Sequence, residues 1–318
     1  MEEDIFDGIR VVIYKPSLER PTNNLLPGYV YYHGGGWTVG SVLIGHSIIK
    51  KLVEESKVVA ILADYRMAPH VKFPVQFEDC LKATKYFMAN AGRFGVDGHR
   101  IGVGGDSAGG NLAAAISLKL RDDKTFGFVP KVQVLVYPAL QVIDLYTPSY
   151  QQTFDRTFMS REGMAWFWSM YITGSANLTK DIALGNHVPL DVKQRFAKSF
   201  LNHDDLDDQF KYLPYKKPEL TEGDGEIWEK IKDVLNPFFA PLKEKNLSSL
   251  PKAFVYTVEY DVLRDEGLWY VQRLRSAGND VQHLHGSTTF HCCCFCLKII
   301  PDVLDHMNAI QRFLEKNL

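Results

Sequence analysis

The sequence lacks any apolar run close to the roughly 18 residues that a membrane-spanning helix needs. Its N-terminus, Met1-Glu2-Glu3-Asp4, is acidic, whereas a signal peptide opens with positive charge. Neither sign of charge dominates, because 36 Lys and Arg stand against 38 Asp and Glu, so no basic patch favours nucleic acid as a partner. We therefore expect a chain without an anchor or signal of its own, which could reside in the cytoplasm.

Cysteine is scarce and unevenly placed. Four of the 5 cysteines lie between positions 292 and 296, which is a poor basis for a disulfide framework. We expect reduced thiols, although Cys80 could pair with one of the four. A zinc site made by Cys293, Cys296 and His291 would need a further pair of ligands, and no such pair lies at a suitable spacing. The sequence therefore predicts no metal site.

Hydrophobic residues make up 46% of the sequence and charged residues 23%, which is typical of a globular protein with a sizeable core. Apolar, β-branched segments alternate with helical ones, and this order predicts an α/β fold with a mostly parallel sheet flanked by helices. Helices are expected over residues 48–55 and 77–89 and after Ser107. The predicted strands are residues 9–14, 28–32, 58–63, 100–104, 132–137, 253–258 and 281–284.

The alternation breaks between about residues 143 and 250. An aromatic helix over residues 164–171 and irregular polar stretches such as residues 203–208 occupy this part. We interpret it as a cap or lid inserted into a single domain that spans residues 1–318. The aromatic stripe of the helix is more typical of packing than of a ligand-binding surface.

The strongest local motif is Gly105-Asp106-Ser107-Ala108-Gly109, at the junction of a predicted strand and a predicted helix. This context is that of a nucleophile elbow, a turn so tight that its flanking residues must be very small. The turn lifts a serine hydroxyl to a helix N-terminus, where the Ala108 amide could help to bind an oxyanion. The alternative is a glycine-rich turn with an idle N-cap serine.

A second motif, His33-Gly34-Gly35-Gly36-Trp37, follows an early predicted strand. The hydrolase fold places the other half of its oxyanion hole there, because amide groups without side chains can converge on one point. A phosphate-binding loop is the alternative, but neither a Walker lysine pattern nor G-x-G-x-x-G is present.

A serine nucleophile needs a general base, and the imidazole of that base needs an acid group that fixes its tautomer. Asp261 lies just beyond the predicted strand 253–258, at the edge where open α/β sheets place their sites, whereas Asp265 and Glu266 fall inside the next helix. His291 follows the last predicted strand. His283 and His285, in or at the end of that strand, remain alternatives for the base.

Taken together, the motifs resemble the hormone-sensitive-lipase-like esterases, and among them the arylacetamide deacetylase group. The resemblance covers nearly the whole chain. It rests on His33-Gly34-Gly35-Gly36-Trp37, Asp64-Tyr65-Arg66-Met67-Ala68-Pro69, Phe73-Pro74 with Phe77-Glu78-Asp79, Gly105-Asp106-Ser107-Ala108-Gly109-Gly110-Asn111-Leu112-Ala113, Tyr137-Pro138-Ala139-Leu140 and Tyr260-Asp261-Val262-Leu263-Arg264-Asp265.

The resemblance implies an α/β-hydrolase fold and a serine carboxylic-ester hydrolase that works without a cofactor on small-molecule or lipid esters, arylacetamides included. It implies Ser107 as nucleophile, Asp261 as orienting acid and His291 as base. The implied oxyanion hole is formed by Gly35, Gly36 and Ala108, with His33 and Gly34 in the loop motif.

Two departures from the family pattern stand out. The histidine is typically followed by glycine, whereas Cys292 follows His291 here. Relatives resemble endoplasmic reticulum membrane proteins with an N-terminal anchor, which this chain lacks, so the implied membrane association would depend on a segment outside it. The alternative function is therefore a catalytically impaired homologue that binds a ligand.

Overall fold

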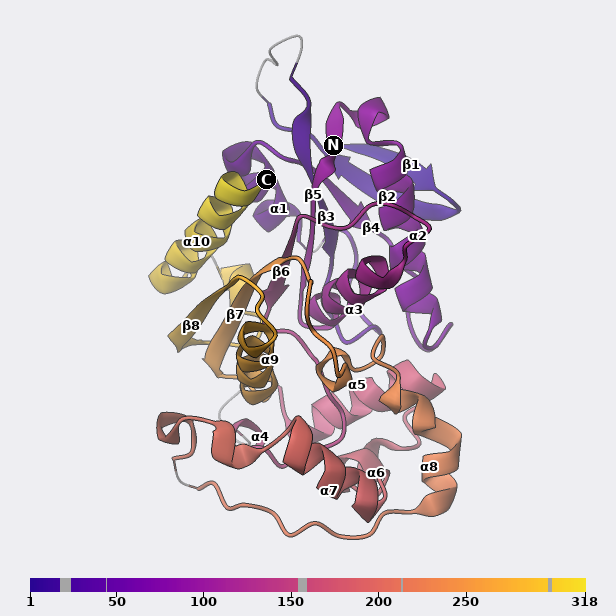
Figure 1. The fold of residues 1–318 in the computed structure, drawn as a ribbon, viewed down its shortest axis with the longest axis vertical. Helices are drawn as coiled ribbons and strands as arrows, with labels where there is room; N and C mark the ends of the chain where they lie inside the picture. Colours follow the sequence, from indigo (N-terminus) through magenta and orange to yellow (C-terminus); the bar gives the residue numbers. More distant parts are fainter. Residues whose placement is uncertain (18–23, 44, 154–158, 213, 297–298) are drawn as a thin grey trace.

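The computed structural model describes residues 1–17, 24–43, 45–153, 159–212, 214–296 and 299–318. Its centre is an eight-stranded sheet in the order β1-β2-β4-β3-β5-β6-β7-β8 (Figure 1). Pairing is parallel from β4 through β3 to β8, and antiparallel where β2 joins β1 and β4. The strands are β1 (Glu2–Phe6), β2 (Ile9–Tyr14), β3 (Leu26–Tyr32), β4 (Val59–Ala63), β5 (Val96–Asp106), β6 (Val132–Val136), β7 (Lys252–Tyr260) and β8 (Val281–Phe290).

The predicted mostly parallel sheet is confirmed, but strand β1 was not predicted. Its acidic first residues do not form the apolar pattern of a strand, because Glu2 and Glu3 are exposed at the edge of the sheet. The signal that could have revealed it is the Asp7-Gly8 turn, whose φ values of 49° and 85° suit a tight hairpin. Strand β8 also continues six residues beyond its predicted end at Leu284.

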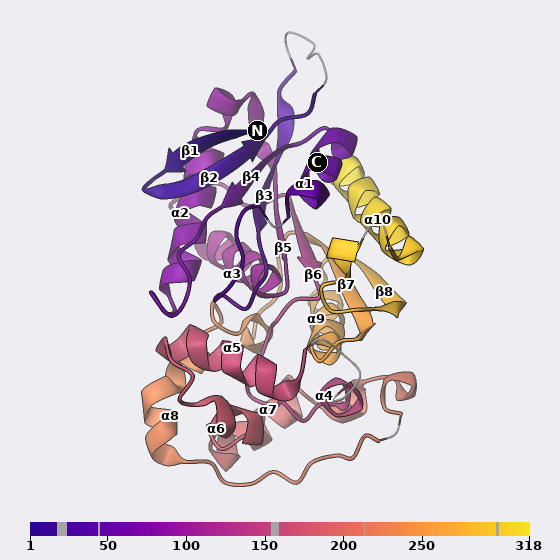
Figure 2. The same cartoon turned by 180° about the vertical axis from the view of Figure 1, so that it is seen from behind.

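Apolar side chains cover both faces of the sheet, because alternate residues of a strand point to opposite sides. Val30 and Ile61 belong to the core under α2 (Val75–Ala89), α3 (Ala108–Asp122) and α9 (Arg264–Ser276). Their neighbours Tyr31 and Leu62 belong to the core under α1 (His46–Ser56) and α10 (Pro301–Asn317). Figure 2 shows α1 and α10 side by side on that face. The sheet is thus sandwiched between two helical layers.

Between β6 and β7 the chain forms a helical layer beyond one end of the sheet, in the lower part of Figure 1. We call residues 148–235 the helical segment. Short helices were hard to foresee in so polar a stretch, and the polar run at 203–208 forms two 3₁₀ turns. The segment contains α4 (Pro148–Gln152), α5 (Arg161–Thr173), α6 (Thr179–Leu184), α7 (Leu190–Ser199) and α8 (Gly225–Ile231).

The aromatic helix α5 packs mainly against the body of the protein. Tyr171 stacks on Trp37 with ring centroids 4.1 Å apart, and on Phe239 at 4.9 Å. Trp168 is also fully buried, 4.6 Å from Trp37. These contacts fix α5 against the loop that follows β3. No helix in the described part of the chain is both long and apolar enough to cross a membrane.

A buried arginine links the helical segment to the sheet. The Arg264 guanidinium donates to Gln152 Oε1 and to the carbonyl of Phe210, at 2.8 and 2.9 Å. It also forms ion pairs with Glu259 at the end of β7 and with Asp265, at 2.9 and 3.0 Å. Because the side chain is fully buried, its charge depends on these partners.

We expect Arg264→Leu to lower the free energy of unfolding by about 3–5 kcal/mol, because it leaves two carboxylates without their cation. Arg275→Leu, on the exposed side of the same helix, is the control and should change it by less than about 0.5 kcal/mol. Urea unfolding followed by circular dichroism measures both. Equal effects of the two substitutions would contradict this account.

Candidate active site

Ser107 sits on a strained turn between β5 and α3. Its φ is 55° and its ψ is −117°, a backbone conformation that L-residues rarely adopt. The turn also needs its two glycines: a Cβ on Gly105 would lie 2.4 Å from the carbonyl oxygen of Tyr32, and one on Gly109 only 1.9 Å from it. The local geometry is that of a nucleophile elbow.

The structure brings together the three residues predicted from the sequence order. His291 Nε2 lies 2.9 Å from Ser107 Oγ, and His291 Nδ1 lies 2.8 Å from Asp261 Oδ2. A carboxylate can only accept, so Nδ1 carries the proton that it donates to Asp261. Nε2 is then left to accept the proton of the serine hydroxyl. All three side chains are buried.

The competing candidates have other partners. His283 and His285 contact Thr257 Oγ1 at 2.8 and 3.0 Å, on the strand neighbouring their own. Asp265 pairs with Arg264 and also accepts from the Ser149 amide at 2.6 Å. Glu266 accepts from the amide of Leu140 and from the side chain of Gln141. None of these four contacts Ser107 among the described residues.

The environment of His291 favours its protonated form. Burial opposes the charge and would lower the pKa, but the Asp261 carboxylate, assisted by Cys292, outweighs burial and raises the pKa of His291 well above its ordinary value of 6.5. A buried imidazolium beside a carboxylate is therefore stabilised. In a proton-transfer step this is the state that the histidine reaches when it takes a proton from serine.

The glycine loop after β3 is held by a residue whose role the sequence did not reveal. Asp106 Oδ1 accepts from the Gly34 amide at 2.9 Å and from the Tyr31 hydroxyl at 2.6 Å. Burial raises the pKa of Asp106, although both donors act against that change. The residue preceding Ser107 thus ties the elbow directly to the loop. Its position within the elbow pentapeptide was the available signal.

His33 braces the same loop. Its Nδ1 lies 2.7 Å from the Gly34 carbonyl, and its ring stacks on Tyr65 at 4.4 Å. Burial lowers the pKa of His33, so the ring is neutral at pH 7. The Gly34 amide donates to Asp106 and is therefore not free to bind an oxyanion. In this respect Gly34 differs from Gly35 and Gly36.

Gly35, Gly36 and Ala108 face the cavity that contains Ser107. Gly35 and Gly36 have φ values of 107° and 58°, and their amides donate to no acceptor among the described residues. Ala108 is the first residue of α3, so its amide has no partner within the helix. A Cβ on Gly36 would lie 1.9 Å from the Phe167 ring, so this glycine also permits α5 to approach.

We call the space above Ser107 the catalytic-serine cavity. Its volume is about 230 Å³, and its walls away from the glycine loop are mainly apolar. Sequence reasoning placed Cys292 beside the base but assigned the aromatic helix to packing, because only the tertiary packing of α5 and of the segment after β8 brings the wall residues here. They include Met159, Met164, Phe167, Cys292 and Phe295.

Cys292 has a backbone conformation that glycine would adopt without strain. Its φ is 67°, in the left-handed region that favours glycine. All five cysteines are free, so the possible disulfide with Cys80 does not form. Cys293 Sγ lies 3.5 Å from the Tyr256 hydroxyl, and the described residues contain no group of three side chains suited to a metal ion.

Comparison with known proteins matches residues 29–200 and 211–295 to the family model of the α/β-hydrolase fold. The chain is 39% identical over 297 residues to arylacetamide deacetylase of Oryctolagus cuniculus, covering 91% of this chain and 73% of that protein. It is 37% identical over 295 residues to neutral cholesterol ester hydrolase 1 of Bos taurus, covering 91% and 72%.

Solved structures of esterases are similar throughout. A thermostable esterase from Pseudomonas putida ECU1011 matches with a TM-score of 0.77 at 26% identity, covering 100% of this chain and 82% of that one. An esterase from Pyrobaculum calidifontis matches with a TM-score of 0.75 at 29% identity, covering 99% and 84%.

The fold and these matches define an α/β hydrolase, as predicted. Within that class the chain belongs to the arylacetamide deacetylase-like branch of the hormone-sensitive-lipase-like esterases. The expected class of ester-hydrolysing enzyme is confirmed with it.

We expect Cys292→Gly to stabilise the histidine loop and to raise the rate of ester hydrolysis severalfold. A non-glycine residue at positive φ costs roughly 1–2 kcal/mol of folding free energy. Glycine relieves this strain, but its greater freedom in the unfolded chain offsets part of the gain. Cys292→Ala is the control, because it removes the thiol and keeps the strain. Urea unfolding and esterase rates test this, and equal gains for Gly and Ala would attribute the effect to the thiol.

We expect Asp261→Asn to lower kcat by about 10⁴-fold, since the imidazole loses its orienting acceptor. Activity requires neutral His291, so it rises as the pH rises through the raised pKa of this group. Without the carboxylate that pKa falls, and the acid limb of the residual kcat/KM profile moves to lower pH. Asp265→Asn is the control and should leave the limb in place. An unmoved limb in Asp261→Asn would contradict the assignment.

Proposed function

We propose that the chain hydrolyses carboxylic esters through an acyl-enzyme on Ser107. The observation that carries this proposal is the hydrogen-bonded chain from Ser107 Oγ through His291 to Asp261, at 2.9 and 2.8 Å. It supplies the three roles that acyl transfer to serine requires: nucleophile, base and orienting acid.

In the first step Ser107 Oγ attacks the ester carbonyl while His291 Nε2 takes the hydroxyl proton. The carbonyl oxygen becomes an oxyanion, and we assign its hydrogen-bond donors to the amides of Gly35, Gly36 and Ala108. One such donor is worth about 2.7–4 kcal/mol in the transition state. The C–O bond to the alcohol then breaks, and the His291 imidazolium protonates the leaving oxygen.

The second step repeats the first with water as nucleophile. His291 takes a proton from water, the resulting hydroxide attacks the acyl carbon, and the bond to Ser107 Oγ breaks with return of the proton to the serine. The products are a carboxylic acid and regenerated enzyme. Every proton moves between His291, Ser107, water and the substrate, so the residues need no cofactor for this cycle.

The cavity favours a small, apolar acyl group. Its volume of about 230 Å³ lies below the roughly 300–1,000 Å³ of common ligand sites. Met159, Met164 and Phe167 offer apolar contact rather than hydrogen bonds. Short-to-medium acyl esters are therefore our first proposal, with the deacetylase and cholesterol ester hydrolase names of the relatives suggesting arylacetamides and lipid esters as further classes. An endoplasmic reticulum setting, implied by the resemblance, stays a prediction.

A ligand-binding protein without catalysis is the second candidate. The observation that favours it is the strained backbone of Cys292 directly beside His291. A displacement of the imidazole by about 1 Å could reduce the rate by roughly 100-fold. Rates on a simple activated ester distinguish the two functions.

We expect p-nitrophenyl acetate and butyrate to be hydrolysed faster than the dodecanoate, and Ser107→Ala to lose roughly 10⁴-fold or more of kcat. Ser117→Ala, at a buried serine within α3, is the matched control and should keep its rate within about twofold. A fluorophosphonate probe should label the wild type at Ser107 alone. Wild-type protein that is folded but neither labelled nor active would overturn the esterase proposal.

A further inference from the structure

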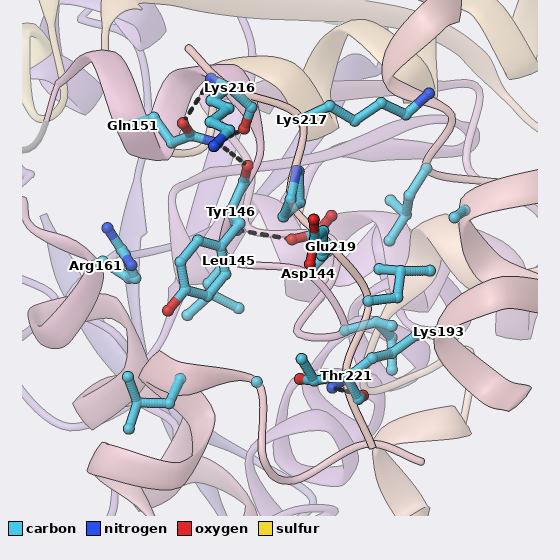
Figure 3. A pocket seen from close by; sticks show the side chains of 17 residues that line it. Asp144, Leu145, Tyr146, Gln151, Arg161, Lys193, Lys216, Lys217, Glu219 and Thr221 are labelled. Atoms are coloured by element: carbon cyan, nitrogen blue, oxygen red, sulfur yellow. Dashed lines mark hydrogen bonds between the residues drawn. The ribbon is translucent and has the colours of Figure 1, made fainter. Parts of the chain in front are cut away.

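The helical segment contains a second, larger cavity. Its volume is about 550 Å³, within the range of small-molecule sites. Figure 3 shows it between Arg161 and Tyr146 on one side and the chain from Lys216 to Thr221 on the other. Its lining shares no described residue with the catalytic-serine cavity. Helix α5 contributes Arg161 to the second cavity, and Met164 and Phe167 to the first.

Cations outnumber acids around this second cavity. The acid Asp144 is engaged, because it accepts from the Tyr146 amide at 2.7 Å and pairs with His203 at 2.9 Å. Lys217 is paired with Asp204 at 2.6 Å, outside the cavity lining. Apart from the Lys217–Asp204 pair, the charged lining residues are the three cations Arg161, Lys193 and Lys216 against the two acids Asp144 and Glu219. The cavity therefore presents unbalanced positive charge to a ligand.

Arg161 is the cation best suited to receive an anion. Its Nε is buried and has no hydrogen-bond partner among the described residues, although a buried donor of a charged group normally has one. The described residues provide no carboxylate within ion-pair distance of it. Its guanidinium lies over the Tyr146 ring, 4.3 Å from the centroid, and this contact holds it at the cavity wall. Arg presents a planar fork that matches a carboxylate.

Much of the rest of the wall is apolar, although Gln151 and Thr221 also line it. Ile143 and Leu145 lead into the helical segment, Leu184 ends α6, and Leu201 follows α7. Lys193 crosses this wall, and its ammonium donates to the Thr221 carbonyl at 2.8 Å, while burial lowers its pKa. An anion with an attached apolar chain would satisfy both the guanidinium and these side chains.

We propose that the second cavity is a binding site for a monocarboxylate with a medium-length apolar chain, whose carboxylate is received by Arg161. Lys216, without a carboxylate partner among the described residues, adds attraction at the cavity rim. The site is separate from Ser107 and its proposal is independent of ester hydrolysis. Binding should therefore persist in a catalytically inactive variant.

The test is calorimetric titration of the full chain carrying Ser107→Ala with octanoate at pH 7. We expect binding, and about a 10-fold or greater loss of affinity with Arg161→Gln, since a charge-assisted hydrogen bond is removed. Lys216→Gln should weaken binding severalfold and serves as a second variant should Arg161→Gln fold poorly. Lys232→Gln is the control, because Lys232 is an exposed cation on the 3₁₀ turn that follows α8, outside the cavity lining. This variant should bind octanoate as tightly as the Ser107→Ala chain does.

Two further ligands identify the chemistry. Octanamide has the same chain without the charge and should bind at least 10-fold more weakly than octanoate. Octyl phosphate tests a phosphate head group, and tighter binding of it than of octanoate would overturn the carboxylate assignment. A crystal soaked with 8-bromooctanoate should show the bromine signal in the second cavity. Absent binding, equal affinity in Arg161→Gln, or bromine in the catalytic-serine cavity alone would each overturn the proposal.

Discussion

The close approach of the turn after β5 to the end of β3 is the constraint on which the site depends. The Tyr32 carbonyl comes so near that neither Gly105 nor Gly109 could carry a Cβ. Ser107 accepts a strained φ of 55° as part of that turn. Asp106 then spans the same gap, accepting from Tyr31 and Gly34. This one close approach therefore fixes the position of Ser107 relative to the glycine loop.

His291 and Asp261 are positioned by the last two strands in the sheet order, β7 and β8. Asp261 follows β7 and His291 follows β8, and these neighbouring parallel strands end at the same edge. The imidazole therefore meets Ser107 although 184 residues separate them in the chain. Cys292, which follows His291, is strained, because its φ of 67° lies in the region that favours glycine. Strain at this position bears directly on the general base.

The helical segment is anchored by different forces at its two sides. Arg264 joins it to the sheet by hydrogen bonds to Gln152 and Phe210 and an ion pair with Glu259. The stack of Tyr171 on Trp37 joins α5 to the glycine loop by apolar contact. Held in this way, α5 separates two cavities of different chemistry. One, of about 230 Å³, is small and apolar above Ser107, and the other, of about 550 Å³, is larger and cationic beside Arg161.

The sequence by itself determined the features that depend on neighbouring residues. The spacing of Gly105 and Gly109 around Ser107 is dictated by the local turn, and the alternation of strand and helix by the period of apolar residues. Sequence order and the family resemblance favoured Asp261 and His291 over a few competitors for the acid and the base. Only the tertiary structure shows which of these side chains contact one another and Ser107, because strand register decides which side chains meet. Packing likewise decided the contacts of Asp106 with Tyr31 and Gly34 and the lining of the cationic cavity. In both cases the residues that meet come from distant parts of the chain.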